Sequence, residues 1–255
     1  MRPATCAPFL IALAAAALAA GCDGTDAPTG SHAPASPPPR VLPAPTFGTG
    51  TVRGTVKFVG APPPRQEIPN VPCHDGAGPL KDETVVVNAN GTLANVFVSL
   101  AGVSPSDGSG REPALLDQVD CRYVPHALAV QVNQPLRVRT SDPGTLHNVH
   151  YNPTNNPPAN FGLTVAGAER PVTFARPEYV RIKCDVHPWM SGYVGVFDHP
   201  FFAVTPEGDG AFQIPRVPPG SYKLLAWHER YGEVEQRVEV GENGVSEVTV
   251  RYEEN

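Results

Sequence analysis

From residue 51 onward, short runs of β-branched and aromatic residues are separated by Pro, Gly, Asn and Asp about every eight to twelve residues. The chain has 31 prolines and 24 glycines among 255 residues. Both residue types interrupt helices, and segments with helical periodicity and caps are essentially missing. The sequence therefore predicts an all-β fold.

The candidate strands form two series. The first series contains the ranges 51–58, 84–88, 93–100, 127–132, 136–140, 172–174, 179–183 and 193–197. After His199 and Pro200 a compact second series follows, with the ranges 201–205, 211–214, 222–227, 234–240 and 245–252. Turn residues such as Gly208, Asp209 and Gly210 separate its first members.

The amino terminus has the pattern of an export signal: Arg2, an apolar run from Phe9 to Ala20, and small residues up to Cys22. Its end resembles the bacterial lipobox, which implies cleavage before Cys22 and a lipid on that sulfur; an ordinary cleaved signal is the alternative. Residues 22–50 are rich in Pro, Ala, Gly, Ser and Thr without an apolar period, which predicts a disordered tether. We therefore expect a protein of the periplasm or cell surface that is anchored to a bacterial membrane.

The charge of the chain argues against nucleic-acid binding. The formal net charge is −6 at pH 7, whereas proteins that bind phosphate backbones are basic. Most of the acidic excess lies after residue 200, so the middle of the chain is nearly neutral. A neutral surface favours contact docking over long-range electrostatic steering.

Three of the five cysteines are expected to be available to the folded part, because Cys6 leaves with residues 1–21 and Cys22 takes the lipid. An odd number of cysteines in an oxidising compartment needs an explanation. We expect a disulfide between Cys73 and Cys121, with Cys184 kept out of it as a metal-bound thiolate. A disulfide between Cys184 and one of the other two is the alternative.

One run concentrates metal donors: it reads Cys184-Asp185-Val186-His187-Pro188-Trp189-Met190-Ser191-Gly192 and lies between two candidate strands. A tight loop can bring its thiolate, imidazole and thioether to one point. Soft sulfur with nitrogen favours copper, and two imidazoles with one thiolate and a weak axial Met make an electron-transfer site. A second imidazole is available at His147, thirty-seven residues before Cys184 and next to Asn148.

This combination resembles the cupredoxin family, whose members carry a His-Asn pair on one strand and a Cys, His, Met loop between the last two. The loop is similar to the short form of amicyanin-like proteins. The resemblance implies a Greek-key β-sandwich and one copper ion, cycling between Cu(I) and Cu(II), with the ligands His147, Cys184, His187 and Met190. It further implies that Asn148 joins the His strand to the Cys loop.

The expected activity is electron transfer with a redox protein partner, without enzymatic turnover. Pro188 and Trp189 are expected to form an apolar docking patch beside His187. Three alternatives stay open: core or surface residues with no metal, a changed metal or ligand set in which His126 is the first substitute, and copper storage or delivery.

The second strand series resembles the small β-sandwich of carboxypeptidase regulatory-like, transthyretin-like and carbohydrate-binding-like domains. This suggests a further alternative, a cell-envelope module that binds carbohydrate or protein, with a structural or vestigial copper site. We predict a copper domain at 84–199 and the second sandwich at 200–255, with residues 51–83 supplying a strand that pairs with it. Trp227 is expected to fill the interface between the two sandwiches.

Overall fold

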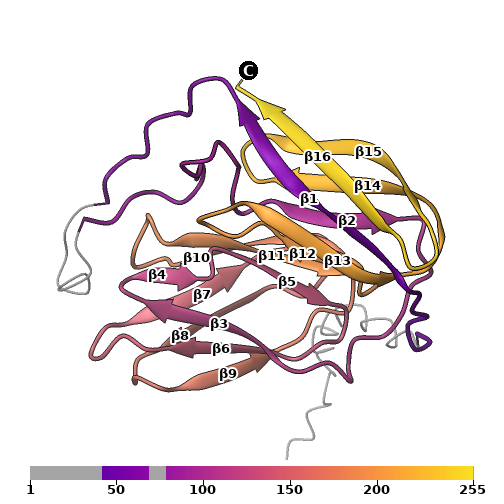
Figure 1. Cartoon of the computed structure of the whole chain (residues 1–255). Helices are drawn as coiled ribbons and strands as arrows, with labels where there is room; N and C mark the ends of the chain where they lie inside the picture. Colours follow the sequence, from indigo (N-terminus) through magenta and orange to yellow (C-terminus); the bar gives the residue numbers. More distant parts are fainter. Residues whose placement is uncertain (1–41, 69–78, 255) are drawn as a thin grey trace, which may run out of the picture. The chain divides into compact units, whose positions relative to one another are not determined.

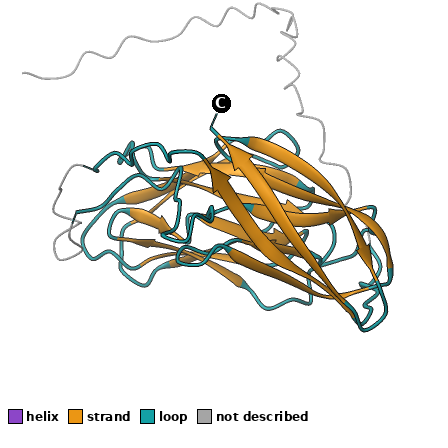
Figure 2. Cartoon of the chain, turned by 45° about the horizontal axis from the view of Figure 1, so that its top comes forward, coloured by secondary structure: helices purple, strands orange, loops and turns teal. Residues whose placement is uncertain are grey.

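The structure is a computed structural model of the chain and describes residues 42–68 and 79–254. The predicted signal and lipid site, most of the tether, and Cys73 lie outside these residues. Within the described ranges the secondary structure consists of strands and turns without a helix, which confirms the all-β prediction (Figure 2). No segment there is a helix with the length and apolar character needed to cross a bilayer.

The strands are assigned in chain order (Figure 1). Their bounds are β1 (Gly50–Val59), β2 (Phe97–Ala101), β3 (Ala114–Val119), β4 (Arg122–Val124), β5 (Ala127–Gln131), β6 (Leu136–Thr140), β7 (His147–Tyr151), β8 (Ala159–Leu163), β9 (Glu169–Val172), β10 (Glu178–Lys183), β11 (Ser191–Phe197), β12 (Phe202–Val204), β13 (Ala211–Val217), β14 (Gly220–His228), β15 (Gly232–Val240) and β16 (Val245–Glu253).

These strands form four sheets. Two of them belong to the first sandwich, with the strand orders β13-β1-β16 and β12-β2-β14-β15. The other two, β5-β11-β10-β7-β8 and β4-β3-β6-β9, form the second sandwich. β1 is antiparallel to β13 and parallel to β16, so the first described strand and the last one share a sheet.

Three apolar clusters fill the spaces between the sheets. They form because each strand turns alternate side chains to opposite faces of its sheet. One cluster joins the two sheets of the first sandwich through residues such as Val52, Leu100 and Ile214. A second cluster fills the second sandwich and includes Cys184 and Met190. A third cluster, centred on Phe97, lies between the sheet that contains β2 and the sheet that contains β11.

Aromatic side chains dominate this third cluster. The ring of Trp227 stacks on Tyr179 with the centroids 4.2 Å apart, and it contacts Tyr193 and Phe97 at 5.1 and 5.8 Å. The prediction that Trp227 packs between the sandwiches is therefore confirmed. Its neighbour His228 is fully buried, and burial lowers the pKa of His228 to about 4.

The strand pairing differs from the predicted domain boundaries at one strand. β2 lies within the range 84–199 but is hydrogen-bonded to β12 and β14. It therefore belongs to the first sandwich, and the strands from β3 to β11 form the second. Residues 84–88, predicted as a strand, contribute only an isolated bridge between Val87 and Leu93, because the chain turns back at Asn88.

Candidate metal centre

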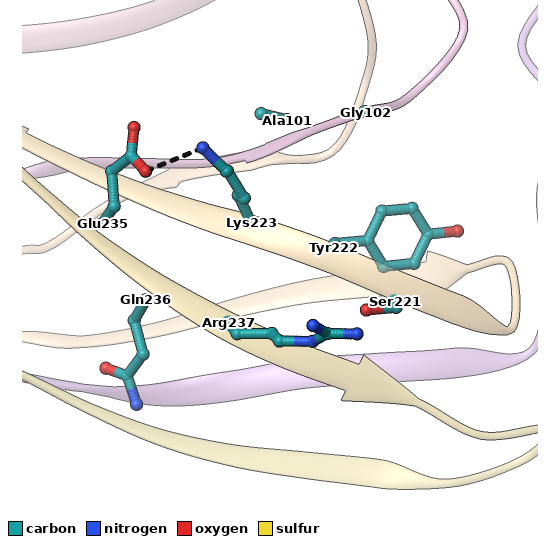
Figure 3. A pocket seen from close by; sticks show the side chains of 8 residues that line it. All are labelled: Ala101, Gly102, Ser221, Tyr222, Lys223, Glu235, Gln236 and Arg237. Atoms are coloured by element: carbon teal, nitrogen blue, oxygen red, sulfur yellow. Dashed lines mark hydrogen bonds and ion pairs between the residues drawn. The ribbon is translucent and has the colours of Figure 1, made fainter.

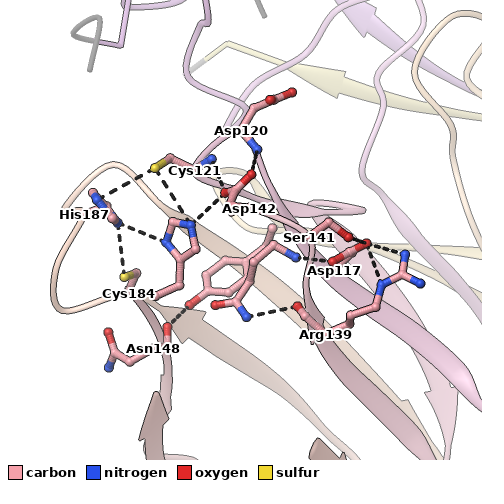
Figure 4. Close-up of polar contacts among 12 residues, drawn as sticks. Asp117, Asp120, Cys121, Arg139, Ser141, Asp142, Asn148, Cys184 and His187 are labelled. Carbon is pink, nitrogen blue, oxygen red and sulfur yellow. Dashed lines mark hydrogen bonds and ion pairs between the residues drawn. The ribbon is translucent and has the colours of Figure 1, made fainter. Parts of the chain in front are cut away.

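Two histidines from separate segments of the second sandwich, one in β7 and one after β10, lie next to each other, and Figure 4 shows the second of them, His187, beside Cys184. His147 is the first residue of β7 and is completely buried. His187 lies on the loop between β10 and β11 and is partly exposed. Their Nδ1 atoms are 3.1 Å apart. β7 is paired with β10 through His150 and Lys183, which explains why the two segments meet.

The loop after β10 folds so that its donor residues converge. Cys184 Sγ lies 3.7 Å from His187 Nδ1. The backbone amide of Cys184 donates to the carbonyl of Met190 at 3.0 Å, and the amide of Met190 donates to the carbonyl of His187 at 2.9 Å. The Met190 side chain is buried and belongs to the same apolar cluster as Cys184. Of the four predicted ligands, His147, Cys184 and His187 thus lie together, and Met190 closes their loop.

Asn148 connects the two segments by hydrogen bonds. Its Oδ1 accepts from the backbone amide of Asp185 at 2.7 Å, and its Nδ2 donates to the Asp185 carboxylate at 3.1 Å. His150, two residues further along β7, also contacts this carboxylate. These contacts agree with the role expected for Asn148 as a link between the His strand and the Cys loop.

The surroundings of Cys184 favour its thiolate. Burial raises the pKa of the Cys184 thiol, but hydrogen bonds from His147 and from the backbone amides of Asn148, His187 and Val186 outweigh this effect, so the net pKa is lowered. Burial likewise lowers the pKa of His147, whereas its contacts with Cys184 and Asp142 raise it, and the net pKa is raised. The electrostatics therefore couple the sulfur and the imidazole.

Sequence reasoning did not find two further groups at this site, Asp142 and the sulfur of Cys121. The Asp142 carboxylate accepts from His147 Nε2 at 2.7 Å. Cys121 Sγ lies 3.9 Å from His147 Nε2 and 3.8 Å from His187 Nε2. The position of Asp142 in a turn five residues before His147 was the available sequence signal. Cys121 is disulfide-bonded and Cys184 is not, as expected. Because Cys73 lies outside the described residues, its pairing with Cys121 stays a prediction.

The two imidazoles thus have donor atoms on two sides, and the Nδ1 side fits a metal ion better. Cys121, His147 and His187 also place one donor atom each within 4.8 Å of one another, but His147 Nε2 already bonds to Asp142. On the Nδ1 side, His187 Nδ1 lies 3.1 Å from His147 Nδ1 and 3.7 Å from Cys184 Sγ. Nitrogen and thiolate ligands lie about 2.0–2.3 Å from an ion such as zinc, so donors of one ion are at most about 4.4 Å apart. The observed spacing lies within this limit.

Comparisons with known proteins give partial likenesses. Neither a protein-family model nor a curated protein matches the chain. A copper-containing nitrite reductase from Thermus scotoductus is 19% identical over 38% of this chain, with a TM-score of 0.32, and the match spans 24% of that enzyme's length. A Cu(I) amicyanin variant is 19% identical over 39% of this chain and 97% of its own, with a TM-score of 0.30. A purple cupredoxin from Nitrosopumilus maritimus is 20% identical over 32% and 98%, with a TM-score of 0.28.

His126, the predicted substitute ligand, is not part of the metal centre. It is buried, and its Nε2 forms an ion pair with Oε1 of Glu229. Burial lowers the pKa of His126, but the hydrogen bond to Glu229 and nearby carboxylates such as Glu83 raise it more, so the net pKa is raised. His126 is therefore bonded to Glu229 of the first sandwich and not to the metal centre.

The side chains around His187 are partly apolar. The indole of Trp189 donates to the carbonyl of Cys121 at 3.2 Å, and its ring centroid lies 5.3 Å from that of His187. Pro188 is exposed, as are Leu146 and Val186. This arrangement is compatible with the docking patch predicted for Pro188 and Trp189, which stays a prediction.

A shallow hollow of about 590 Å³ lies against β14 and β15 in the first sandwich (Figure 3). Its rim carries Lys223 and Glu235, which form an ion pair at 3.0 Å. Tyr222 is the aromatic residue of its lining, and the hydroxyl of Tyr222 donates to the carbonyl of Pro218. A surface with one tethered tyrosine gives little support to the carbohydrate-binding alternative.

Proposed function

We propose that this chain is a mononuclear copper protein of the cupredoxin type that carries single electrons. His147, Cys184, His187 and Met190 would hold the ion. The observation that carries the proposal is the convergence of His147 Nδ1, His187 Nδ1 and Cys184 Sγ, with separations of 3.1 and 3.7 Å between neighbouring donors. Two imidazoles with one thiolate are the donor set of copper electron-transfer sites.

When bound, copper supplies a one-electron couple between Cu(I) and Cu(II). The protein's contribution is to hold the donors in one geometry. His147 is fixed by Asp142, Cys184 accepts hydrogen bonds from backbone amides, and the loop is closed by the amide of Met190. Ligands that keep their positions reduce the rearrangement that accompanies each electron transfer.

His187 is the ligand through which we propose that electrons enter and leave. It is partly exposed, whereas His147 and Cys184 are buried. Exposed apolar residues beside it, Leu146 and Val186, suit a transient protein contact. The proposed partner is a redox protein that meets this surface outside the cytoplasm, with the chain held at a membrane by a lipid on Cys22.

An absorption spectrum of the protein with one equivalent of Cu(II) tests the proposal. We expect an intense visible band from charge transfer between the Cys184 thiolate and Cu(II). Cys184→Ala should abolish this band, whereas Met190→Leu should keep it and shift the reduction potential.

The matched control is His150→Asn, because His150 is three residues from His147 on the same strand and bonds to Asp185 instead of the metal centre. This variant should keep the band. A wild-type protein that binds Cu(II) without a visible band would refute the electron-carrier proposal. A band that survives Cys184→Ala would refute the assignment of Cys184 as the thiolate ligand.

A further inference from the structure

A single buried carboxylate joins the His147 imidazole to a neighbouring turn. Asp142 accepts three hydrogen bonds: from the backbone amide of Asp120 at 2.7 Å, from the amide of Cys121 at 2.9 Å and from His147 Nε2 at 2.7 Å (Figure 4). The residue is 6% exposed. Water therefore does not compete strongly for these donors, and their effect on the carboxylate is large.

The turn that supplies two of these donors is an unusual one. Asp120 and Cys121 form the two-residue connection between β3 and β4, where Val119 is paired with Arg122. Both residues have φ in the left-handed region, at 52° and 53°. Hairpin turns of this kind favour Asn-Gly, because side chains other than Gly, Asn and Asp rarely adopt this backbone conformation.

The contacts with the Asp142 carboxylate explain how the turn keeps this backbone conformation with Asp and Cys at its two positions. Successive amides in such a turn can point to a common centre and form a concave anion site. Oδ1 and Oδ2 of Asp142 take one amide each. The same contacts hold Cys121 in place, so that its sulfur lies against the outer edges of both imidazoles.

We propose that Asp142 is a positioning residue for the copper site, which fixes the proton of His147 on Nε2 and directs the Nδ1 lone pair to the metal. The proposal rests on the proposed function. Among the described residues, the Asp142 oxygen lies 2.7 Å from His147 Nε2 and is closer than the Cys121 sulfur at 3.9 Å. The carboxylate is therefore the acceptor.

A carboxylate on the outer nitrogen also makes the imidazole a stronger donor to a metal. Stronger donation stabilises Cu(II) more than Cu(I), because the dication withdraws more charge from its ligands. Asp142 is thus expected to lower the reduction potential of the site. A residue with a purely structural role would leave the potential unchanged.

Asp142→Asn tests this role. The amide offers one acceptor oxygen where three donors converge, and its NH₂ group would face N–H groups. We expect Cu(II) affinity to fall about 10- to 100-fold, the range for loss of such partners, with a smaller fall for Cu(I) and hence a higher potential. Asp142→Glu keeps the charge and should recover part of the difference.

A matched control is Asp117→Asn. Asp117 is also a buried carboxylate that accepts from a backbone amide, that of Gln118, but its other partners are Arg139 and Ser141. This variant should lose stability and keep the potential. If Asp142→Asn binds copper with the wild-type potential, the inference is wrong.

Nitrogen-15 NMR of the metal-free protein separates the two proposals. We expect the His147 proton on Nε2 in the wild type and a mixture of tautomers in Asp142→Asn. This measurement needs no copper, so it stands even if the visible band is absent and the electron-carrier proposal fails. A wild-type imidazole with its proton on Nδ1 would overturn the role of Asp142, whether or not the variant folds.

Discussion

Asp117 shows at the scale of one residue how the second sandwich stabilises a buried charge. Its side chain is 8% exposed, and burial alone raises the pKa of this carboxyl. Hydrogen bonds from Arg139, Ser141 and the Gln118 amide lower the pKa further than burial raises it. A carboxyl with a lowered pKa stabilises the fold above its unfolded pKa of about 3.9, and this stabilisation is lost as the pH falls through the folded pKa.

We therefore expect Asp117→Asn to lower the free energy of unfolding at pH 7 by about 1.5–3 kcal/mol, the range for hydrogen bonds to a charged group. The lower half of this range is expected, because Arg139 is partly exposed. Urea unfolding at pH 7 and at pH 3 measures the difference, which should shrink at the acidic pH.

The control is Glu235→Gln, which removes an exposed ion pair with Lys223. Exposed pairs contribute about 0–1 kcal/mol, so little change is expected. An Asp117→Asn difference that stays constant between the two pH values would contradict the assignment of its effect to the charge.

At the scale of elements, β11 connects the metal-binding loop to the interface between the two sandwiches. It follows Met190 directly and pairs with β10 and β5. A Cβ on Gly195 would lie 2.6 Å from the Phe97 ring of β2. The missing side chain therefore makes room for an aromatic ring of the neighbouring sheet.

Gly195→Ala should lower the free energy of unfolding by about 1–3 kcal/mol, the effect of overpacking a core, because the ring of Phe97 has to move. The matched control is Gly241→Ala, where a Cβ meets nothing within 4 Å, and a change within about 0.5 kcal/mol is expected. Equal effects of the two substitutions in chemical denaturation would show that Gly195 has no packing role.

The strands that sequence reasoning found are those with alternating or β-branched residues. The predicted range 136–140 agrees with the bounds of β6 (Leu136–Thr140), because apolar residues alternate with arginines there. In the structure Leu136, Val138 and Thr140 are buried, and the residues between them are more exposed. β3 was not predicted, because its run Ala-Leu-Leu-Asp-Gln-Val has no alternation and includes a buried Asp and Gln. Arg139 bonds to both of these residues: its side chain donates to the Asp117 carboxylate, and its carbonyl accepts from Nε2 of Gln118.

Local spacing predicted that the donors between Cys184 and Met190 converge in one loop, and the resemblance to cupredoxins implied that His147 joins them. Neither revealed Asp142 or the sulfur of Cys121, because their contacts depend on the β3–β4 turn folding over the site. Long-range contacts between short polar segments leave no periodic pattern in a sequence. Such contacts have to be found in the structure.

At the scale of the molecule, the described strands start in the first sandwich with β1 and β2, form the second sandwich from β3 to β11, and return to the first at β12. The predicted boundary at residue 84 placed β2 in the copper domain, whereas β2 belongs to the first sandwich. The sequence of a buried apolar strand does not indicate which sheet it joins. Phe97 of β2 contacts rings from both sandwiches, with centroids 5.5 Å from Tyr179 and 5.8 Å from Trp227. The two sandwiches therefore share one aromatic core.

This shared core predicts one cooperative unfolding transition. In urea, far-UV circular dichroism and tryptophan fluorescence should report the same midpoint, because loss of either sandwich would expose the Phe97 cluster. Trp227→Ala should lower the free energy of unfolding by about 3 kcal/mol, the low end for a buried aromatic, since Trp227 is only partly buried. Val245→Ala, at an exposed site, should change it by less than about 0.5 kcal/mol. Separate midpoints in the wild type would mean that the sandwiches unfold independently, and the aromatic contacts would then contribute little to the stability of either one.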